Sequence, residues 1–290
     1  MNAAITTDSM PSKDFLLTII TINWNNKDGL EKTMKSVINQ NTREFEYVIV
    51  DGASQDGSVE TIRQYADDKV IWVSEKDNGI YNAMNKGIRM AKGKYVMMLN
   101  SGDWLIDNTI VVKLLTSLRL KNYPDILYGT TINVWPDGRQ VRNVENEDNY
   151  TMFSFYHGTL DHVGTCIKKN LFDQYGMYDE SLHICSDWSW FMKVVAFGGV
   201  KPIHIDLDTA YFDMTGISEN NGKNRQIIVN ERRKVLTANL PIGVLADYDI
   251  YCDDILMIKR LHRHKWAFTI VRAVERVLFK IEKWKTHISQ

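Results

Sequence analysis

Short apolar, β-branched runs alternate with helical periodicity over the first hundred residues, and this alternation constrains the fold more than any other feature. Strands are predicted at residues 15–23, 47–51, 70–74 and 95–99. Between them, apolar residues recur every three or four positions and predict helix faces, which carry Leu30, Met34, Val37 and Ile38, then Val59, Ile62 and Tyr65, then Ile80, Met84, Gly87, Ile88 and Ala91. The pattern predicts an α/β fold in which helices cover a parallel sheet.

The second half of the chain is less regular. A further strand is predicted at residues 126–134, and no internal repeat or low-complexity linker follows it. We therefore expect a single domain with a remodelled second half. The net charge of −1 over 290 residues argues against a basic nucleic-acid binder. Three widely spaced cysteines favour a reducing compartment, and neither a secretory signal nor a membrane-spanning run is expected.

Polar clusters follow three of the predicted strands, at residues 23–26, 51–54 and 100–103. In an open α/β sheet, ligands bind outside the carboxyl ends of the strands, so these clusters should line one site. Asp51 could accept hydrogen bonds from a sugar hydroxyl or a nucleobase, or simply begin a turn. Asp103 could hold a divalent cation on a diphosphate, or belong to an ordinary turn. Two carboxylates at neighbouring strand ends favour the ligand site.

Asp187 stands at the start of an apolar helical run. The position suits a helix cap, and it equally suits a general base at the mouth of a site. Position in the sequence does not choose between the two roles.

Five segments together resemble a family 2 glycosyltransferase of the GT-A fold, from about residue 15 to residue 220. They are the strand ending in Asn23, Asp51-Gly52-Ala53-Ser54, Asp77-Asn78-Gly79, Asn100-Ser101-Gly102-Asp103, and the region from His162 through Ser186-Asp187-Trp188. The similar proteins include bacterial enzymes of colanic acid, capsule and O-antigen assembly. The resemblance implies a Rossmann-like mixed sheet with helices on both faces.

The resemblance also implies roles for individual residues. Donor-nucleotide contacts would come from Asn23, Asp51, Asp77, Asn78, Gly79, Asn85, Asn100, Gly216 and Ser218. Asp103 would hold Mg²⁺ or Mn²⁺, although the family's usual Asp-x-Asp is replaced here by Asn100, Ser101 and Gly102. Asp187 would be the catalytic base, with Ser186 in place of the usual glutamate. His162 and Trp188 would lie on the acceptor side, and a structural role for His162 is an equal alternative.

The implied activity is an inverting, metal-dependent transfer of a sugar. The donor would be a nucleotide-diphosphate sugar, most commonly a UDP-sugar in this family. The acceptor would be a hydroxyl of a lipid-linked glycan in the synthesis of O-antigen, capsule or exopolysaccharide. A non-catalytic nucleotide-sugar or glycan-binding scaffold is the alternative from another class.

The last 32 residues differ from the rest. Residues 259–290 carry nine Lys/Arg and two Glu, a local charge of +7. Apolar residues then recur at spacings of three and four, at Ala267, Ile270, Val274, Val277, Ile281, Trp284 and Ile288. We expect a basic amphipathic helix on the inner face of the cell membrane, after a GT-A domain at 15–220 and a helical extension at 221–258. A helix packed on the body and a short dimeric coiled coil are the alternatives.

Overall fold

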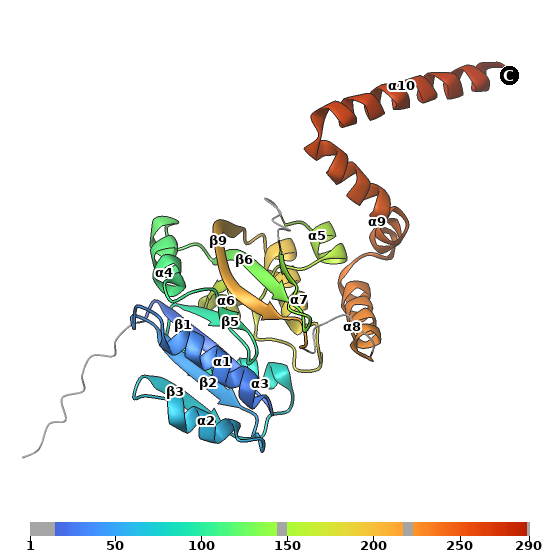
Figure 1. The fold of residues 1–290 in the computed structure, drawn as a ribbon. Coiled ribbons are helices and arrows are strands. Elements are labelled where there is room, and N and C mark those ends of the chain that lie inside the picture. The colour runs from blue at the N-terminus through green and yellow to red at the C-terminus, as the bar shows by residue number, and fades with distance from the viewer. Residues whose placement is uncertain (1–14, 144–149, 217–222, 289–290) are drawn as a thin grey trace, which may run out of the picture. The chain divides into compact units, whose positions relative to one another are not determined.

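The computed structural model describes residues 15–143, 150–216 and 223–288. The chain divides into two compact units, Met1–Lys234 and Val235–Gln290. The first unit holds the sheet and its helices, and the second consists of the C-terminal helices (Figure 1).

The alternating pattern of the first hundred residues forms the expected strands and helices. Their bounds are β1 (Leu17–Asn23), α1 (Lys27–Ile38), β2 (Glu46–Asp51), α2 (Ser58–Tyr65), β3 (Val70–Ser74), α3 (Ile80–Met90) and β4 (Tyr95–Met98). The prediction of an α/β fold is therefore confirmed, and the strands end within one residue of the predicted positions.

The less regular second half adds strands and short helices. Their bounds are β5 (Trp104–Leu105), α4 (Ile110–Leu120), β6 (Ile126–Val134), β7 (Gln140–Arg142), α5 (Met152–His157), β8 (Cys166–Lys168), α6 (Asn170–Tyr175), α7 (Ser186–Phe191), a π-helix η1 (Met192–Phe197), β9 (Pro202–Asp213) and α8 (Lys223–Asn239).

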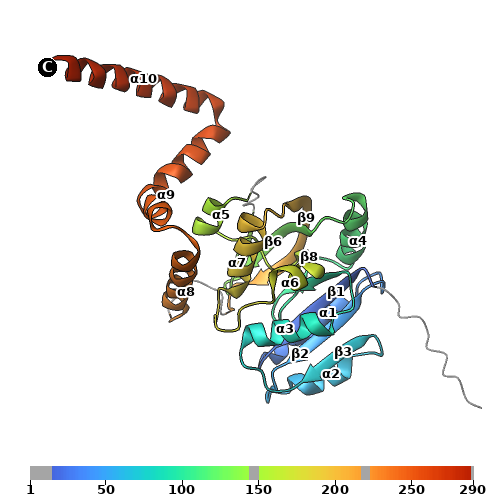
Figure 2. The ribbon, with the colours of Figure 1, turned by 180° about the vertical axis from the view of Figure 1, so that it is seen from behind.

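The strands form one mixed sheet in the order β3-β2-β1-β4-β8-β6-β9-β5, with β7 paired to β6. The first four strands of this order are parallel, whereas β8 is antiparallel to both of its neighbours. The carboxyl ends of β1, β2 and β4 consequently meet at one edge, where the three polar clusters begin. Figure 2 shows the same layers from behind.

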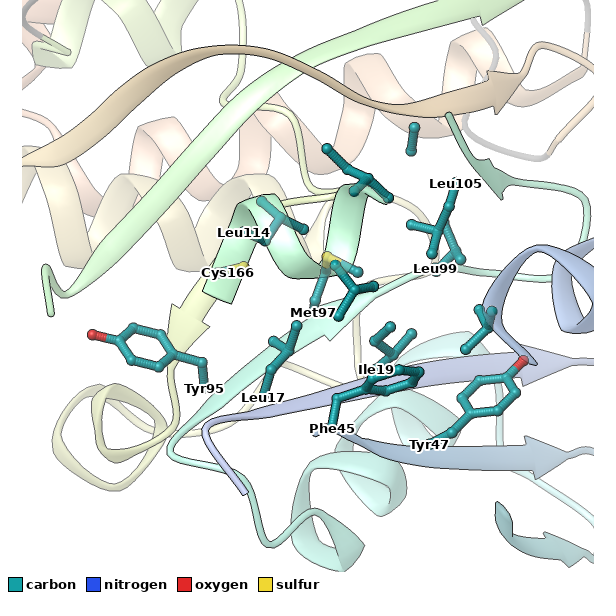
Figure 3. Close-up of a cluster of buried hydrophobic side chains, with 14 of the residues drawn as sticks. Leu17, Ile19, Phe45, Tyr47, Tyr95, Met97, Leu99, Leu105, Leu114 and Cys166 are labelled. Carbon is teal, nitrogen blue, oxygen red and sulfur yellow. The ribbon is translucent and has the colours of Figure 1, made fainter. Parts of the chain in front are cut away.

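Helices cover both faces of the parallel part, as expected. Successive side chains of a strand point to opposite faces. Leu17 and Ile19 of β1 join the buried cluster that includes residues of α1, α2 and α4 (Figure 3). Ile20 points the other way and meets α3, where a Cβ added at Gly87 would lie 2.5 Å from Ile20 Cγ2. The absence of a side chain at Gly87 lets α3 approach the sheet closely.

The C-terminal unit contains α9 (Ile242–Arg263) and α10 (Lys265–Ile288). None of the helices in the described residues combines the length and apolarity that a membrane span requires. Several apolar side chains of α10 are more than half exposed, among them Ile270, Val274 and Val277. The expected domain limits at residues 220 and 258 stay predictions.

Candidate functional site

The ends of β1 and β2 are tied together by a buried carboxylate. Asp51 has no exposed surface, and its Oδ1 accepts hydrogen bonds from Asn23 Nδ2 at 2.8 Å and from Ser54 Oγ. Its Oδ2 accepts from the Ser54 backbone N–H and from Ser74 Oγ at 2.6 Å. Asp51 therefore shapes the loop after β2 with four hydrogen bonds from the protein itself.

The loops after β1 and β4 also meet directly. Asn26 Nδ2 donates to the Ser101 carbonyl at 3.0 Å, and Asn26 Oδ1 accepts from the Gly29 N–H as the cap of α1. Below them, the buried Thr33 Oγ1 donates to the Asp103 carbonyl at 2.6 Å and accepts from the Gly102 N–H at 3.1 Å. Through these contacts the structure brings together the three polar clusters that the sequence places at strand ends.

Asp103 lies against a second carboxylate, Asp213, at the end of β9. The Asp213 backbone N–H donates to Asp103 Oδ1 at 2.9 Å. Burial raises the pKa of the Asp103 carboxyl to about 8; the charge of Asp213 adds to this effect and the backbone N–H opposes it. Gly102 has φ of +109°, and a Cβ there would come within 3.4 Å of Asp213 Oδ2. The carboxylates of Asp103 and Asp213 thus lie close together beside Gly102, which has no side chain to separate them.

This pair of carboxylates suits a hard cation. Like charges placed close together favour a positive partner, and carboxylate oxygens are the ligands that Mg²⁺ and Mn²⁺ prefer. The described residues contain no group of three or more His, Cys, Asp and Glu side chains that could hold a metal alone. One or two carboxylates are enough when phosphate oxygens and waters complete the shell. Among the described residues, the buried Asn100 Oδ1 has no hydrogen-bond partner, and the Asn100 carbonyl accepts from the Asp103 N–H in the same turn.

Lys32 of α1 is a cation near the same carboxylates. Burial lowers the pKa of its ammonium, while the charges of Asp213 and Asp103 act in the opposite direction. Its Nζ lies 2.9 Å from the centre of the Trp104 ring, which stacks on Tyr211. Lys32 was not recognised from the sequence, because it reads as one of several charged residues on an exposed helix face.

The predicted donor-side residues in and before α3 make different contacts with the rest of the protein. Asp77 forms an ion pair with Lys86, and Asn78 and Gly79 follow it to begin α3. Asn85 is buried, and its amide bonds Tyr178 in both directions, donating to the carbonyl at 2.9 Å and accepting from the N–H at 3.0 Å. In this structure Asn85 joins α3 to the loop before α7.

Asp187 occupies the first turn of α7 and meets the first turn of α3. Its Oδ1 lies 2.8 Å from the Tyr81 hydroxyl, whose pKa burial and the Asp187 charge raise well above the usual value. Its Oδ2 lies 3.9 Å from His162 Nδ1. Burial lowers the pKa of His162, against the influence of Asp187, and the other ring nitrogen bonds the Tyr178 hydroxyl at 2.9 Å. Asp187 is thus a partly exposed carboxylate with a fixed orientation.

Glu231 of α8 anchors the loop that leads into Asp187. Its carboxylate accepts from three consecutive backbone N–H groups, those of His183 at 2.5 Å and of Ile184 and Cys185 at 3.0 Å. Burial alone would raise the pKa of Glu231, but these hydrogen bonds bring it below its ordinary value. No local pattern reveals this role, since the partners lie 46 to 48 residues apart in the sequence.

Trp188 packs under Arg232, the residue that follows Glu231 in α8. The indole is 3% exposed and donates from Nε1 to the Phe155 carbonyl at 2.9 Å. The Arg232 guanidinium carbon lies 4.9 Å from the centre of the Trp188 ring. The structure therefore places Trp188 in the core under Arg232, and its expected contact with an acceptor stays a prediction.

The loop after β9 is partly described. The Gly216 N–H donates to the Asp213 carbonyl at 3.4 Å, so Gly216 lies beside the carboxylate pair. Ser218, expected on the donor side, lies outside the described residues. Asp213 ends β9, directly before this loop. Nothing in the local sequence around Asp213 indicated that it would contact Asp103.

A comparison with known protein families finds a match to Glycosyl transferase family 2 over residues 18–193. An uncharacterised glycosyltransferase of Mycobacterium tuberculosis is 27% identical over 211 residues, covering 70% of this chain and 77% of its own length. Hyaluronan synthase of Pasteurella multocida is 24% identical over 233 residues, covering 77% of this chain and 24% of its own length.

Solved structures share the fold. S. aureus TarS 1-349, in complex with UDP-GlcNAc, has a TM-score of 0.61 and 18% identity, covering 78% of this chain and 68% of that one. The mannosyltransferase PcManGT of Pyrobaculum calidifontis, in complex with GDP-Man and Mn²⁺, has a TM-score of 0.54 and 15% identity, covering 93% of this chain and 90% of that one. These likenesses confirm the GT-A fold.

The Glu231 anchor predicts a pH-dependent loss of stability. Replacing Glu231→Gln should lower the free energy of unfolding at pH 7 by about 1–3 kcal/mol, because charge-assisted hydrogen bonds to backbone amides are lost. A lowered folded-state pKa means that this stability is present above the unfolded pKa and is lost as pH falls through the folded pKa. Urea unfolding between pH 7 and pH 3 should show the two proteins converging at the acid end.

Glu60→Gln is the matched control, because the Glu60 side chain is 73% exposed in α2. Its free energy of unfolding should stay within about 0.5 kcal/mol of the wild-type value. Equal stability of Glu231→Gln and wild type at pH 7 would contradict the anchoring role.

Proposed function

The chain belongs to the family 2 glycosyltransferases, and on this basis we propose that it is an inverting, metal-dependent sugar transferase. It moves a sugar from a nucleotide-diphosphate sugar, most simply a UDP-sugar, to a hydroxyl of a lipid-linked glycan. The product belongs to a bacterial surface polysaccharide such as O-antigen, capsule or exopolysaccharide. The observation that carries the proposal is Asp187, held by Tyr81 at the start of α3, which itself begins at the carboxyl edge of the sheet.

Asp187 acts as the general base in this proposal. Its carboxylate takes the proton of the acceptor hydroxyl as that oxygen forms a bond to the anomeric carbon of the donor sugar. The bond between the anomeric carbon and the diphosphate oxygen breaks on the opposite face, so the configuration inverts. The Tyr81 hydroxyl, 2.8 Å from Oδ1, orients the carboxylate, and the His162 ring lies beyond hydrogen-bond distance on the other side, with Nδ1 3.9 Å from Oδ2.

The donor lies across the ends of β1, β2 and β4. Asn23, Asp51 and the segment from Asp77 to Gly79 form the nucleotide side of this proposed site. Asp103 and Asp213 would hold Mg²⁺ or Mn²⁺, and such a cation would supply positive charge to balance the negative charge of the leaving diphosphate. Lys32 adds a fixed positive charge beside them, and Asn100 presents its amide oxygen.

The catalytic assignment predicts a selective loss of turnover in Asp187→Asn. General-base help contributes about 10²–10⁴-fold, so release of nucleoside diphosphate should fall by at least that factor. Binding of UDP with Mn²⁺, measured by calorimetry, should be unchanged because Asp187 does not touch the donor side. Turnover is measured with a panel of nucleotide sugars and diphosphate-lipid-linked acceptor sugars.

Asp173→Asn, an exposed change in α6, is the control and should keep wild-type turnover. Wild-type turnover in Asp187→Asn would rule out this base. A wild-type chain that binds nucleotide sugars and never releases the diphosphate would instead favour the non-catalytic scaffold.

The metal assignment predicts a loss of ligand-induced stability in Asp103→Asn. Ligand at about 100 times its Kd stabilises the folded state by about 2.7 kcal/mol, so Mn²⁺ with UDP should raise the Tm of the wild type. Asp103→Asn should lose most of this rise, and the Asp173→Asn control should keep it. The thermal shift is measured without turnover. An undiminished shift in Asp103→Asn would place the metal elsewhere.

The C-terminal unit is proposed to bring the enzyme to the inner face of the cell membrane. Ile270, Val274 and Val277 share one exposed face of α10, and residues 259–265, where α9 ends and α10 begins, are basic or histidine at six of seven positions. An amphipathic helix of this kind binds anionic lipid through apolar burial and charge.

The membrane proposal predicts selective vesicle binding by the full chain. It should sediment with vesicles containing phosphatidylglycerol and much less with pure phosphatidylcholine, and salt should weaken the binding. Val274→Asp with Val277→Asp should abolish sedimentation, whereas Val112→Asp, an exposed change in α4, should not. Retained sedimentation of the double variant contradicts the proposal, and a dimer that the double variant disrupts would favour a coiled coil.

A further inference from the structure

A small polar cavity lies among β6, the end of α5 with the segment that follows it, and α8. Its volume is about 180 Å³, and its walls include Tyr128, Asn143, Thr159, Asp161 and Arg232. Figure 2 shows α5 and α7 near β6 in this part of the first unit. Pockets for drug-sized ligands are roughly 300–1,000 Å³, so this cavity suits one small unit of a larger molecule.

Arg232 gives one wall of the cavity a positive charge. Within the described residues it has no carboxylate within ion-pair distance, and its Nε has no hydrogen-bond partner. One terminal nitrogen donates to the Gly158 carbonyl at 3.2 Å, and the guanidinium lies over the Trp188 ring. Burial lowers the pKa of Arg232, while Cys185 and the charge of Asp187 act in the opposite direction. A largely buried arginine without a direct ion pair is costly, and an anion bound against it would offset that cost.

Asp161 makes another part of the cavity wall acidic, and its carboxylate already accepts hydrogen bonds from neighbouring side chains. Its carboxylate accepts from Thr131 Oγ1 at 2.6 Å and from Asn143 Nδ2 at 3.0 Å. Both of these donors are neutral, and each carboxylate oxygen can accept more than one hydrogen bond. The cavity therefore offers a cation for an anionic group and an acceptor for hydroxyl groups.

The cavity is connected to the proposed base at two points. Asp161 directly precedes His162, whose Nδ1 lies 3.9 Å from Asp187 Oδ2. Arg232 covers Trp188, which directly follows Asp187. The charge of Asp187 also acts on Arg232, opposing the effect of burial on its pKa, so a group bound against Arg232 would lie in the neighbourhood of the proposed base.

We propose that this cavity is an acceptor subsite for an acidic sugar, one that carries a carboxylate or a phosphate. Arg232 binds the anionic oxygens, which a guanidinium matches with paired N–H groups. Asp161 accepts from ring hydroxyls and sets the orientation of the ring. The proposal rests on the proposed transferase function and narrows its acceptor to glycans with an acidic unit near the reacting hydroxyl.

Calorimetry on the full chain tests this subsite without turnover. UDP or GDP with Mg²⁺ is present at saturation, so that the donor site is filled. The probes are glucuronic acid for the carboxylate, glucose 6-phosphate for the phosphate, and glucose as the neutral match. At least one acidic probe should bind to the wild type, and glucose should bind at least about 10-fold more weakly, because a hydrogen bond to a charged group is lost.

Three variants make the assignment to Arg232 specific. Arg232→Met should weaken the binding of the acidic probe at least about 10-fold. Arg232→Lys should recover part of this affinity, because it keeps the positive charge but lacks the paired donors. Arg233→Met, an exposed change at the next position, should bind like the wild type. Thermal unfolding verifies that each variant is folded, and Arg232→Lys serves for the comparison if Arg232→Met is not.

The outcomes separate this inference from the proposed function. Equal binding of glucose and the acidic probes, wild-type affinity in the Arg232 variants, or no binding of either acidic probe would overturn the subsite. If the chain still releases nucleoside diphosphate from nucleotide sugars, only the subsite is lost. If acidic sugars bind through Arg232 and no nucleotide sugar is ever turned over, the transferase proposal fails and the subsite stands.

Discussion

The parallel pairing of β1 with β2 on one side and β4 on the other organises the whole site. The chain passes from β1 to β2 and β3 in one direction, then crosses to β4 on the opposite side of β1. The connections therefore diverge between β1 and β4, and a switch point of this kind is where open α/β sheets bind their ligands. The Asn26 contact with Ser101 bridges the two loops.

The two proposed halves of the site differ in how they are held. On the donor side, the loops that leave the neighbouring strands β1, β2 and β4 bond directly to one another, and Asp51 alone accepts four hydrogen bonds. On the acceptor side, the base depends on distant segments, because Tyr81 comes from α3 and Glu231 from α8. Precise placement of a carboxylate requires such support, since a small displacement of a reacting group costs rate.

Sequence patterns predicted the parallel half of the fold because each of its strands is a compact β-branched run with a helix of clear period beside it. The strands at 70–74 and 126–134 have the predicted bounds. Strand-end chemistry also indicated Asp51 and Asp103, since position along a strand is local information. Asp213, Glu231 and Arg232 were missed because their roles arise only when segments far apart in sequence pack together, which no periodicity encodes.

The three amide groups held by Glu231 bear on how the chain can be divided. The family match ends at residue 193, and β9 ends at Asp213, so either limit looks like a natural place to cut. A fragment ending there would leave the N–H groups of residues 183–185 facing an empty space, directly before the residue assigned as the base. The smallest autonomous unit is therefore longer than the family's shared region, and it reaches into α8.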